Sequence, residues 1–285
     1  MWKQLISLAL ILTLAGCAAK TFEDAEQAEA QGDFDEAAEI WRELADAENG
    51  RALLALYRLH MSTGVGFDSD EEARDVLEQL ATEAQMPEAQ YRLALLLYAE
   101  REFEQVRDFM TAAADQGHGE ARGWLDDHRG LLQRKIRTQR GSPRQQYQLG
   151  QDLYFGQHGV QEDHQAAAYW HRLAATGRNV DAQAMLAYQY LEGMGVVQDP
   201  EQAYEWYREA AMQGHGVSQG TLGYLYGQGL GIDQDDVMAY VWSVLGAENG
   251  HEQAERNRSV YLNRLSNRQR LEAHNQLRRI ESLMD

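Results

Sequence analysis

The sequence predicts an all-α protein built from stacked helix-turn-helix repeats. Three tryptophans, Trp170, Trp206 and Trp242, are spaced 36 residues apart, and an alanine precedes each by three residues. Between them, apolar residues recur at helical spacing and glycine-rich turns separate the helical runs. A period of this length is typical of repeat architectures, in which each unit buries its apolar face against its neighbours.

The clearest repeat is the segment 181–214. Two helix-periodic halves are joined by the turn Gly193-Met194-Gly195-Val196. We expect Asp199 to cap the second helix and Pro200 to occupy its first position, where no amide donor is needed. The same positions recur in the flanking segments: Leu149, Leu186 and Leu222 in the first helices, and Asp163, Asp199 and Asp235 before the second helices.

These recurring residues have mechanical roles. Small residues such as Ala187 and Gly223 allow close helix approach, and turn glycines permit positive φ. The tryptophans are expected to be buried between layers. Apolar positions at helical spacing normally form the core, so we interpret the set as core and caps and not as ligands.

The pattern L-A/G-x-x-Y-x-x-G-x-G-V/I-x-x-D-x-x-x-A-x-x-W-x-x-x-A-A-x-x-G-H resembles the Sel-one-like repeat, a relative of the tetratricopeptide repeat. Three copies of it span 143–251. The resemblance implies a right-handed α/α superhelical solenoid that acts as an adaptor in protein complexes. It implies neither catalysis nor a cofactor.

Composition limits the classes of partner that the surface of the chain can bind. The chain has 285 residues, 44% hydrophobic content and a formal net charge of −19. Such a charge disfavours binding to nucleic acid or anionic lipid through the bulk surface, because both need cationic patches. The single cysteine, Cys17, excludes an intramolecular disulfide.

The amino terminus carries a targeting pattern. Residues 1–16 combine a positive start with a short apolar run, which predicts a signal peptide that is too short to span a bilayer as a helix. The run ends in Leu14-Ala15-Gly16-Cys17, which resembles a bacterial lipobox. The resemblance implies cleavage before Cys17 and its lipidation by acyl chains of the palmitate type, which give stable anchoring together. Ala18 in place of aspartate implies sorting to the periplasmic face of the outer membrane.

Residues 17–128 are interpreted as the lipidated amino terminus followed by degenerate repeats. Ala38, Trp41 and Ala45 reproduce the repeat spacing, and Gly117-His118 closes a shorter unit of tetratricopeptide character. This half is acidic, with about 27 acidic and 9 basic side chains between Lys20 and His128.

The remaining boundaries follow from charge and capping signals. Residues 129–142 form a basic connector with five bases and no acid from Arg129 to Arg140, either a docking surface or a solvated helix. Ser142 is expected to cap a helix that begins at Pro143, with Gln145 completing a capping box. Residues 252–285 are predicted to be capping helices.

No catalytic or metal constellation stands out. Gly216-Val217-Ser218-Gln219-Gly220 matches the esterase string G-x-S-x-G, but that motif requires a turn between a strand and a helix, and here a helix precedes it. His164 and His171 lie about 10 Å apart along a helix, too far to share one metal ion. We therefore expect no enzyme, no metal and no cofactor.

The favoured hypothesis is a lipid-anchored periplasmic scaffold that assembles or regulates an envelope complex through protein partners. First helices of such repeats usually line the binding face, and exposed tyrosines are good anchors. Packing between repeats is an equally open role for the same residues. The chain also resembles lipoproteins that support exopolysaccharide secretion. The alternatives are an envelope signalling regulator that binds a sensor domain, and an envelope hydrolase acting through Ser218 or a histidine. The candidate partner-binding residues are Tyr147, Gln151, Tyr188 and Tyr224.

Overall fold

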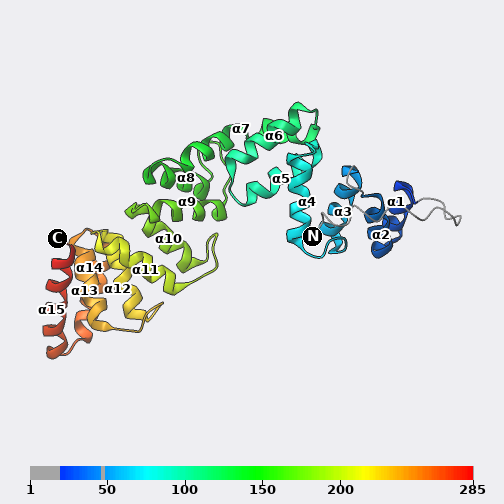
Figure 1. The fold of residues 1–285 in the computed structure, drawn as a ribbon. Helices are drawn as coiled ribbons and strands as arrows, with labels where there is room; N and C mark the ends of the chain where they lie inside the picture. Colours follow the sequence, from blue (N-terminus) through cyan, green and yellow to red (C-terminus); the bar gives the residue numbers. More distant parts are fainter. Residues whose placement is uncertain (1–19, 46–48, 285) are drawn as a thin grey trace. The chain divides into compact units, whose positions relative to one another are not determined.

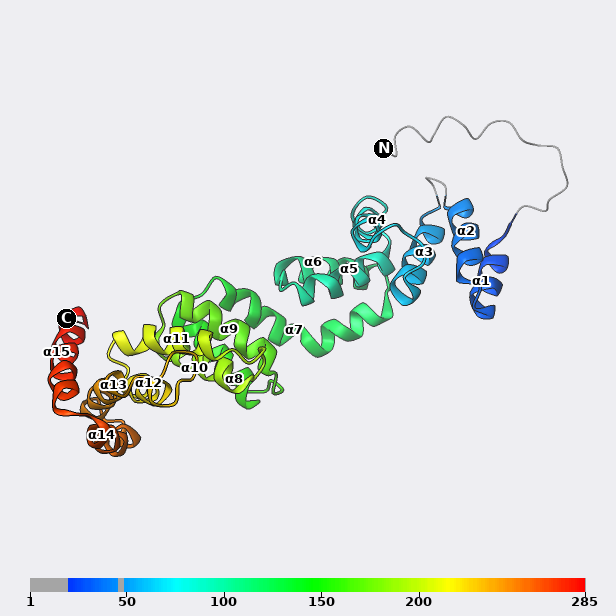
Figure 2. The same cartoon turned by 90° about the horizontal axis from the view of Figure 1, so that it is seen from below.

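The computed structural model describes residues 20–45 and 49–284, which form fifteen α-helices and no strand (Figures 1 and 2). The predicted all-α solenoid class is confirmed. The signal segment 1–16 and Cys17 lie outside the described residues, so their interpretation stays a prediction. None of the helices in the described ranges combines the length and the apolar composition that crossing a bilayer requires.

The chain divides into two compact units, the first ending at Leu132 and the second beginning at Gln133. The helices of the first unit are α1 (Phe22–Gln31), α2 (Phe34–Leu44), α3 (Gly50–Thr63), α4 (Asp70–Thr82), α5 (Pro87–Ala99) and α6 (Phe103–Asp115). The second unit contains α8 (Pro143–Phe155), α9 (His164–Thr176), α10 (Val180–Glu192), α11 (Pro200–Met212), α12 (Gly216–Gln228), α13 (Asp236–Glu248), α14 (Glu252–Arg264) and α15 (Asn267–Met284).

The basic connector expected at 129–142 is mostly helical. Helix α7 (Gly119–Gln139) runs through it without interruption, so the boundary expected at Arg129 falls inside a helix. Arg134 forms an ion pair with Asp152 of α8, and Lys135 is only 5% exposed. These two bases therefore pack within the second unit and are not free for docking, whereas Arg129 and Arg137 face outward.

The predicted helix starts are confirmed. Ser142 and Gln145 form a reciprocal capping box before α8, with Pro143 in its first turn. Asp163 and Asp199 accept hydrogen bonds from the amides of Ala166 and Gln202, at 2.9 and 3.0 Å. Asp235 does the same for α13. These caps follow from local sequence because each satisfies amides that the first helical turn leaves free.

The tryptophan prediction holds in two of three repeats. Trp170 and Trp242 are 0% and 3% exposed, whereas Trp206 is only half-buried. Tyr204 and Tyr207 of the same helix supply the buried aromatic area there, and Trp206 packs at the edge of two core clusters. The prediction that Trp206 is buried like its equivalents is therefore wrong.

Buried amides connect successive repeats. The side chain of Gln183 on α10 donates to the Ala175 carbonyl at the end of α9 (3.3 Å), and it accepts from Gln213 at the end of α11 (2.6 Å). Gln219, Ala211 and Asn249 repeat this relay one unit later, and Gln90, Ala81 and Gln116 form it in the first unit. The relay gives these carbonyls, which lie in the last turn of a helix, a side-chain donor from the next repeat. The sequence signal was the spacing of 36 between Gln183 and Gln219.

The second glycine of two of the turns fixes the approach of neighbouring repeats. A Cβ placed on Gly195 would lie 2.0 Å from the carbonyl oxygen of His164, and one on Gly231 would lie 2.0 Å from that of Pro200. Both glycines have positive φ, +76° and +71°. The turn of one repeat therefore lies directly on the start of the preceding repeat's second helix, where no side chain fits.

The carboxyl end closes the second unit. Helix α15, red in Figure 1, packs on α13 and α11 and buries Ala273 and Ile280. Its Leu271 and Leu283 are both 65% exposed. The helix therefore has one packed face and one open face.

Candidate protein-interaction surface

Two of the four candidate residues form an open surface on successive first helices. Tyr188 on α10 and Tyr224 on α12 are 38% and 44% exposed. Each follows a fully buried leucine, Leu186 or Leu222, by two positions. Two positions rotate about 200° around a helix, so the tyrosines must face away from the core when the leucines face into it. Their orientation thus follows from the repeat register.

The other two candidates are engaged with each other. On α8, the amide of Gln151 lies in hydrogen-bond contact with the hydroxyl of Tyr147, and both side chains are half-buried. The Tyr147 ring lies 5.7 Å from the ring of His171. Burial raises the pKa of Tyr147, with a hydrogen bond from Gln151 opposing the effect. These two residues thus take part in the packing between repeats that the sequence left open as an alternative role.

The exposed surface includes residues that the sequence did not lead us to propose. Val260 on α14 stands 36 residues after Tyr224 and is 50% exposed. Val217, seven residues before Tyr224 on α12, shares its helix face and is 51% exposed. We name Tyr188, Val217, Tyr224 and Val260 the first-helix surface. The spacing of 36 would have found Val260, but 252–285 was interpreted only as a cap.

The first-helix surface has the chemistry of a contact site. It consists of exposed apolar and aromatic groups in register on α10, α12 and α14. Tyrosine offers a large, rigid area with a polar hydroxyl, which suits protein interfaces. Its residues can bind by burial and hydrogen bonding, and they include no nucleophile or general base.

The structure brings a serine, a histidine and an aspartate together elsewhere. Ser218 Oγ lies 2.8 Å from Nδ1 of His215, and Nε2 of His215 lies 3.8 Å from Oδ1 of Asp181. However, Ser218 is 0% exposed and its own amide also donates to His215, which caps α12. Burial lowers the pKa of His215. A nucleophile needs access to substrate, and this serine has none, so the arrangement is a helix cap.

No metal centre is formed in the part of the chain that the structure describes. Nowhere in residues 20–45 and 49–284 do three or more His, Cys, Asp or Glu side chains converge to hold an ion. His164 and His171, considered above as ligands, have separate surroundings. His164 pairs with Glu162 at 2.9 Å, and His171 bonds to Gln189 at 2.8 Å.

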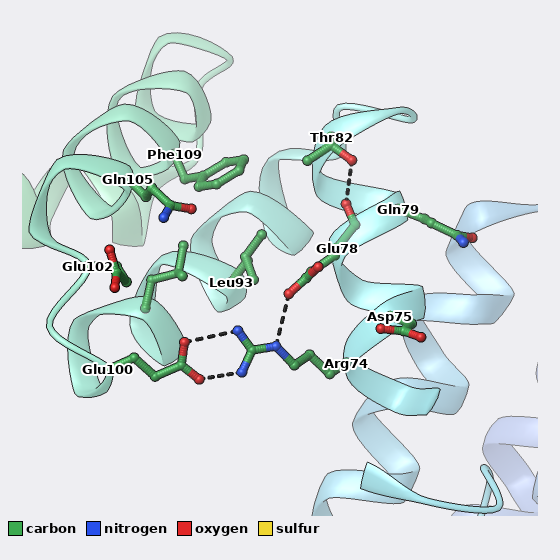
Figure 3. Close-up of a pocket in the computed structure, with 11 residues that line it drawn as sticks. Arg74, Asp75, Glu78, Gln79, Thr82, Leu93, Glu100, Glu102, Gln105 and Phe109 are labelled. Carbon is green, nitrogen blue, oxygen red and sulfur yellow. Dashed lines mark hydrogen bonds and ion pairs between the residues drawn. The ribbon is translucent and has the colours of Figure 1, made fainter. Parts of the chain in front are cut away.

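The first unit contains an acidic groove that the sequence interpretation missed. Its volume is about 550 Å³, and it lies between α4 and α6 over α5 (Figure 3). Asp75, Glu78, Glu100 and Glu102 line it together with the base Arg74, and its floor contains Leu93, Leu97 and Phe109. Figure 3 shows the guanidinium of Arg74 directed at Glu100 and Glu78, which it bonds. These residues come from three helices that are separated in the sequence, so no linear motif predicts the groove.

Comparison with known proteins identifies repeats in both units. The Sel1 repeat model matches residues 87–118, 146–179, 180–215 and 219–251. The first match lies in the segment interpreted above as degenerate repeats. No curated protein matches the chain.

Two solved structures illustrate the similarity. One is a protective antigen of uropathogenic Escherichia coli strains that displays an SLR fold, with 25% identity over 92% of this chain and a TM-score of 0.46. The alignment covers 52% of that antigen, so the chain spans about half of its length. The other is a Sel1 repeat protein from Oxalobacter formigenes, with 33% identity, 46% of this chain and 98% of that chain covered, and a TM-score of 0.41.

Proposed function

We propose that this chain, which is a Sel1-like repeat protein, holds protein partners of the cell envelope on its first-helix surface. Sel1 repeat proteins are generally protein-protein interaction scaffolds, and their fold is typically non-catalytic. The finer proposal concerns which residues bind and where in the cell they do so.

One observation carries the proposal. Tyr188, Tyr224 and Val260 stand in register on three successive first helices and are each 38–50% exposed. Contiguous exposed apolar residues on a folded protein are typical of interaction sites. The hydroxyls of two tyrosines add hydrogen-bonding capacity without a charge that must be desolvated. A row of this kind suits a partner segment that runs across several repeats.

The location that we propose follows from Cys17. Its lipobox resemblance supports cleavage, lipidation and anchoring at the periplasmic face of a bacterial outer membrane. The scaffold would then assemble an envelope complex, and an exopolysaccharide secretion system is the complex that we put forward on the resemblance stated above. The membrane contact would be made through the lipid, since the protein surface is strongly acidic.

Crosslinking purification from solubilised envelope tests both parts. The wild-type chain is compared with Tyr188→Ala/Tyr224→Ala, and partners are identified by mass spectrometry. We expect a discrete partner to be reduced about tenfold or more in the double variant, because truncating two interface aromatics removes several kcal/mol of contact. A third bait, Cys17→Ser, should leave the membrane fraction and lose palmitate labelling.

A matched control separates contact from general damage. Val197→Ala/Leu283→Ala also truncates two exposed apolar side chains, which are 88% and 65% exposed and lie outside the first-helix surface. This control should retain the partner. Equal loss in both double variants, with helicity unchanged in circular dichroism, would remove the first-helix surface from the proposal.

A further inference from the structure

The acidic groove of the first unit has one partly exposed apolar side chain on its floor, and it carries negative charge that no base of the groove neutralises. Phe109 is half-buried on its floor, beside the more deeply buried Leu93 and Leu97. Arg74 is already paired with two acids. It bonds Glu100 through both terminal nitrogens and Glu78 through Nε at 2.9 Å.

Two acids of the groove remain unpaired. Asp75 on α4 and Glu102 at the start of α6 are exposed and have no ion-pair partner among the residues that the structure describes. The surrounding unit adds to their field, with about 27 acids against 9 bases between Lys20 and His128. The groove is therefore complementary to an element that carries cations around an apolar centre.

Such an element exists in the same chain. Helix α15 packs through Ala273 and Ile280, and the opposite side of the helix carries Arg268, Leu271 and Arg278. All three are exposed, and Leu271 is 65% exposed. Arg268 has no bonding partner in the described chain, and Arg278 contacts only the neutral Asn275. The open face of α15 therefore carries two arginines, Arg268 and Arg278, on either side of Leu271.

We propose that the acidic groove of one copy binds the open face of α15 of a second copy. Leu271 would cover the floor at Phe109, while Arg268 and Arg278 would meet the unpaired Asp75 and Glu102. The contact joins different surfaces of the two copies, so each bound pair keeps one free groove and one free α15. Head-to-tail contacts of this kind continue into larger assemblies unless they close into a ring. The inference is independent of the first-helix surface.

Charge reversal and exchange test the proposal. Full-length chain purified in mild detergent is followed by sedimentation velocity, and two differently tagged copies are co-purified after coexpression. We expect wild-type association that grows with protein concentration and weakens with salt. Asp75→Lys/Glu102→Lys and Arg268→Glu/Arg278→Glu should each weaken self-association about tenfold or more, since each makes groove and helix repel.

Mixing the two variants gives the decisive result. In the mixture, the unaltered groove of the helix variant can bind the unaltered α15 of the groove variant, and the basic groove also faces the acidic helix. Association should therefore return between unlike copies only. Glu201→Lys/Glu209→Lys, which reverses two exposed acids on α11, should associate like wild type. A monomeric wild type at about 100 µM, far above the range of most specific contacts, would overturn the proposal. So would association that neither reversal weakens, or weakening that mixing does not restore.

Discussion

His171 shows how one residue is set by its neighbours from other helices. It is 0% exposed on α9, and its Nδ1 lies 2.8 Å from the side-chain oxygen of Gln189 on α10. Because that oxygen can only accept, Nδ1 carries the proton of a neutral ring. A Cβ on Gly150 of α8 would lie 2.4 Å from the ring, so only glycine leaves room for it. Three helices thus fix one uncharged imidazole.

The buried imidazole predicts a loss of stability in mild acid. Burial lowers the pKa of His171 to about 4 from 6.5, with the bond to Gln189 opposing the effect. Between these values the unfolded chain binds a proton that the folded chain refuses, so the folded state loses stability as pH falls from 6.5 to 4. The loss approaches about 3 kcal/mol. The His171→Gln variant should not show this part of the stability loss as the pH falls.

Hydrogen exchange of α9 amides, corrected for intrinsic rates, measures the effect locally. Wild type and His171→Gln are compared at about pH 6.5 and about pH 4.5, which bracket most of the expected change. Other groups titrate in the same range, but they are common to both proteins, so the difference between the two pH dependences isolates His171. Parallel pH dependences would show that His171 keeps its ordinary pKa.

At the scale of elements, the turn glycines act on the packing between repeats as well as on the turn itself. Gly159, Gly195 and Gly231 share a positive φ of +79°, +76° and +71°. Only the last two lie against the preceding repeat's helix, whereas a Cβ on Gly159 would meet no atom within 4 Å. The three glycines therefore offer a comparison at similar φ.

Alanine substitutions should separate the two roles. Gly159→Ala is expected to cost about 1–2 kcal/mol, the penalty of a left-handed alanine. Gly195→Ala adds a clash with the His164 carbonyl and should cost at least about 2 kcal/mol more, in line with overpacking in a tight interface. Exchange rates of α9 and α10 amides give the comparison. Equal effects at both sites would mean that the contact between repeats accommodates the added methyl group with no further loss of stability.

At the scale of the molecule, charge divides the chain into unlike halves. The first unit holds most of the net charge of −19, whereas residues 133–285 carry about 18 acids and 15 bases. Like charges within a compact unit repel and oppose folding. Repulsion between exposed charges is screened by salt, with a Debye length of about 10 Å at 0.1 M.

Salt should therefore stabilise the first unit selectively. Raising NaCl from about 0.02 M to about 0.5 M is expected to slow hydrogen exchange in α2 to α6 more than in α9 to α13, because it screens the larger self-repulsion. Peptide-resolved exchange reports both units in one sample, and sodium sulfate at matched ionic strength checks for effects specific to the ion. A uniform response of both units would contradict the charge argument.

Sequence by itself determined the fold class and the helix starts in the second unit. These features depend on local chemistry and on register. Asp163 and Ser142 each cap a helix through an amide three residues away, and a period of 36 carries one orientation to the next repeat. Such information lies within a few turns of chain and can be read directly.

Tertiary structure alone decided the half-burial of Trp206, the exposure of Tyr188 and Tyr224, the neutral state of His171 and the acidic groove. Most of these arise where side chains from different helices meet. Whether a tyrosine is exposed depends on what the neighbouring repeat places against it. Burial and ionisation are set by these surroundings, and surroundings exist only after the repeats have stacked.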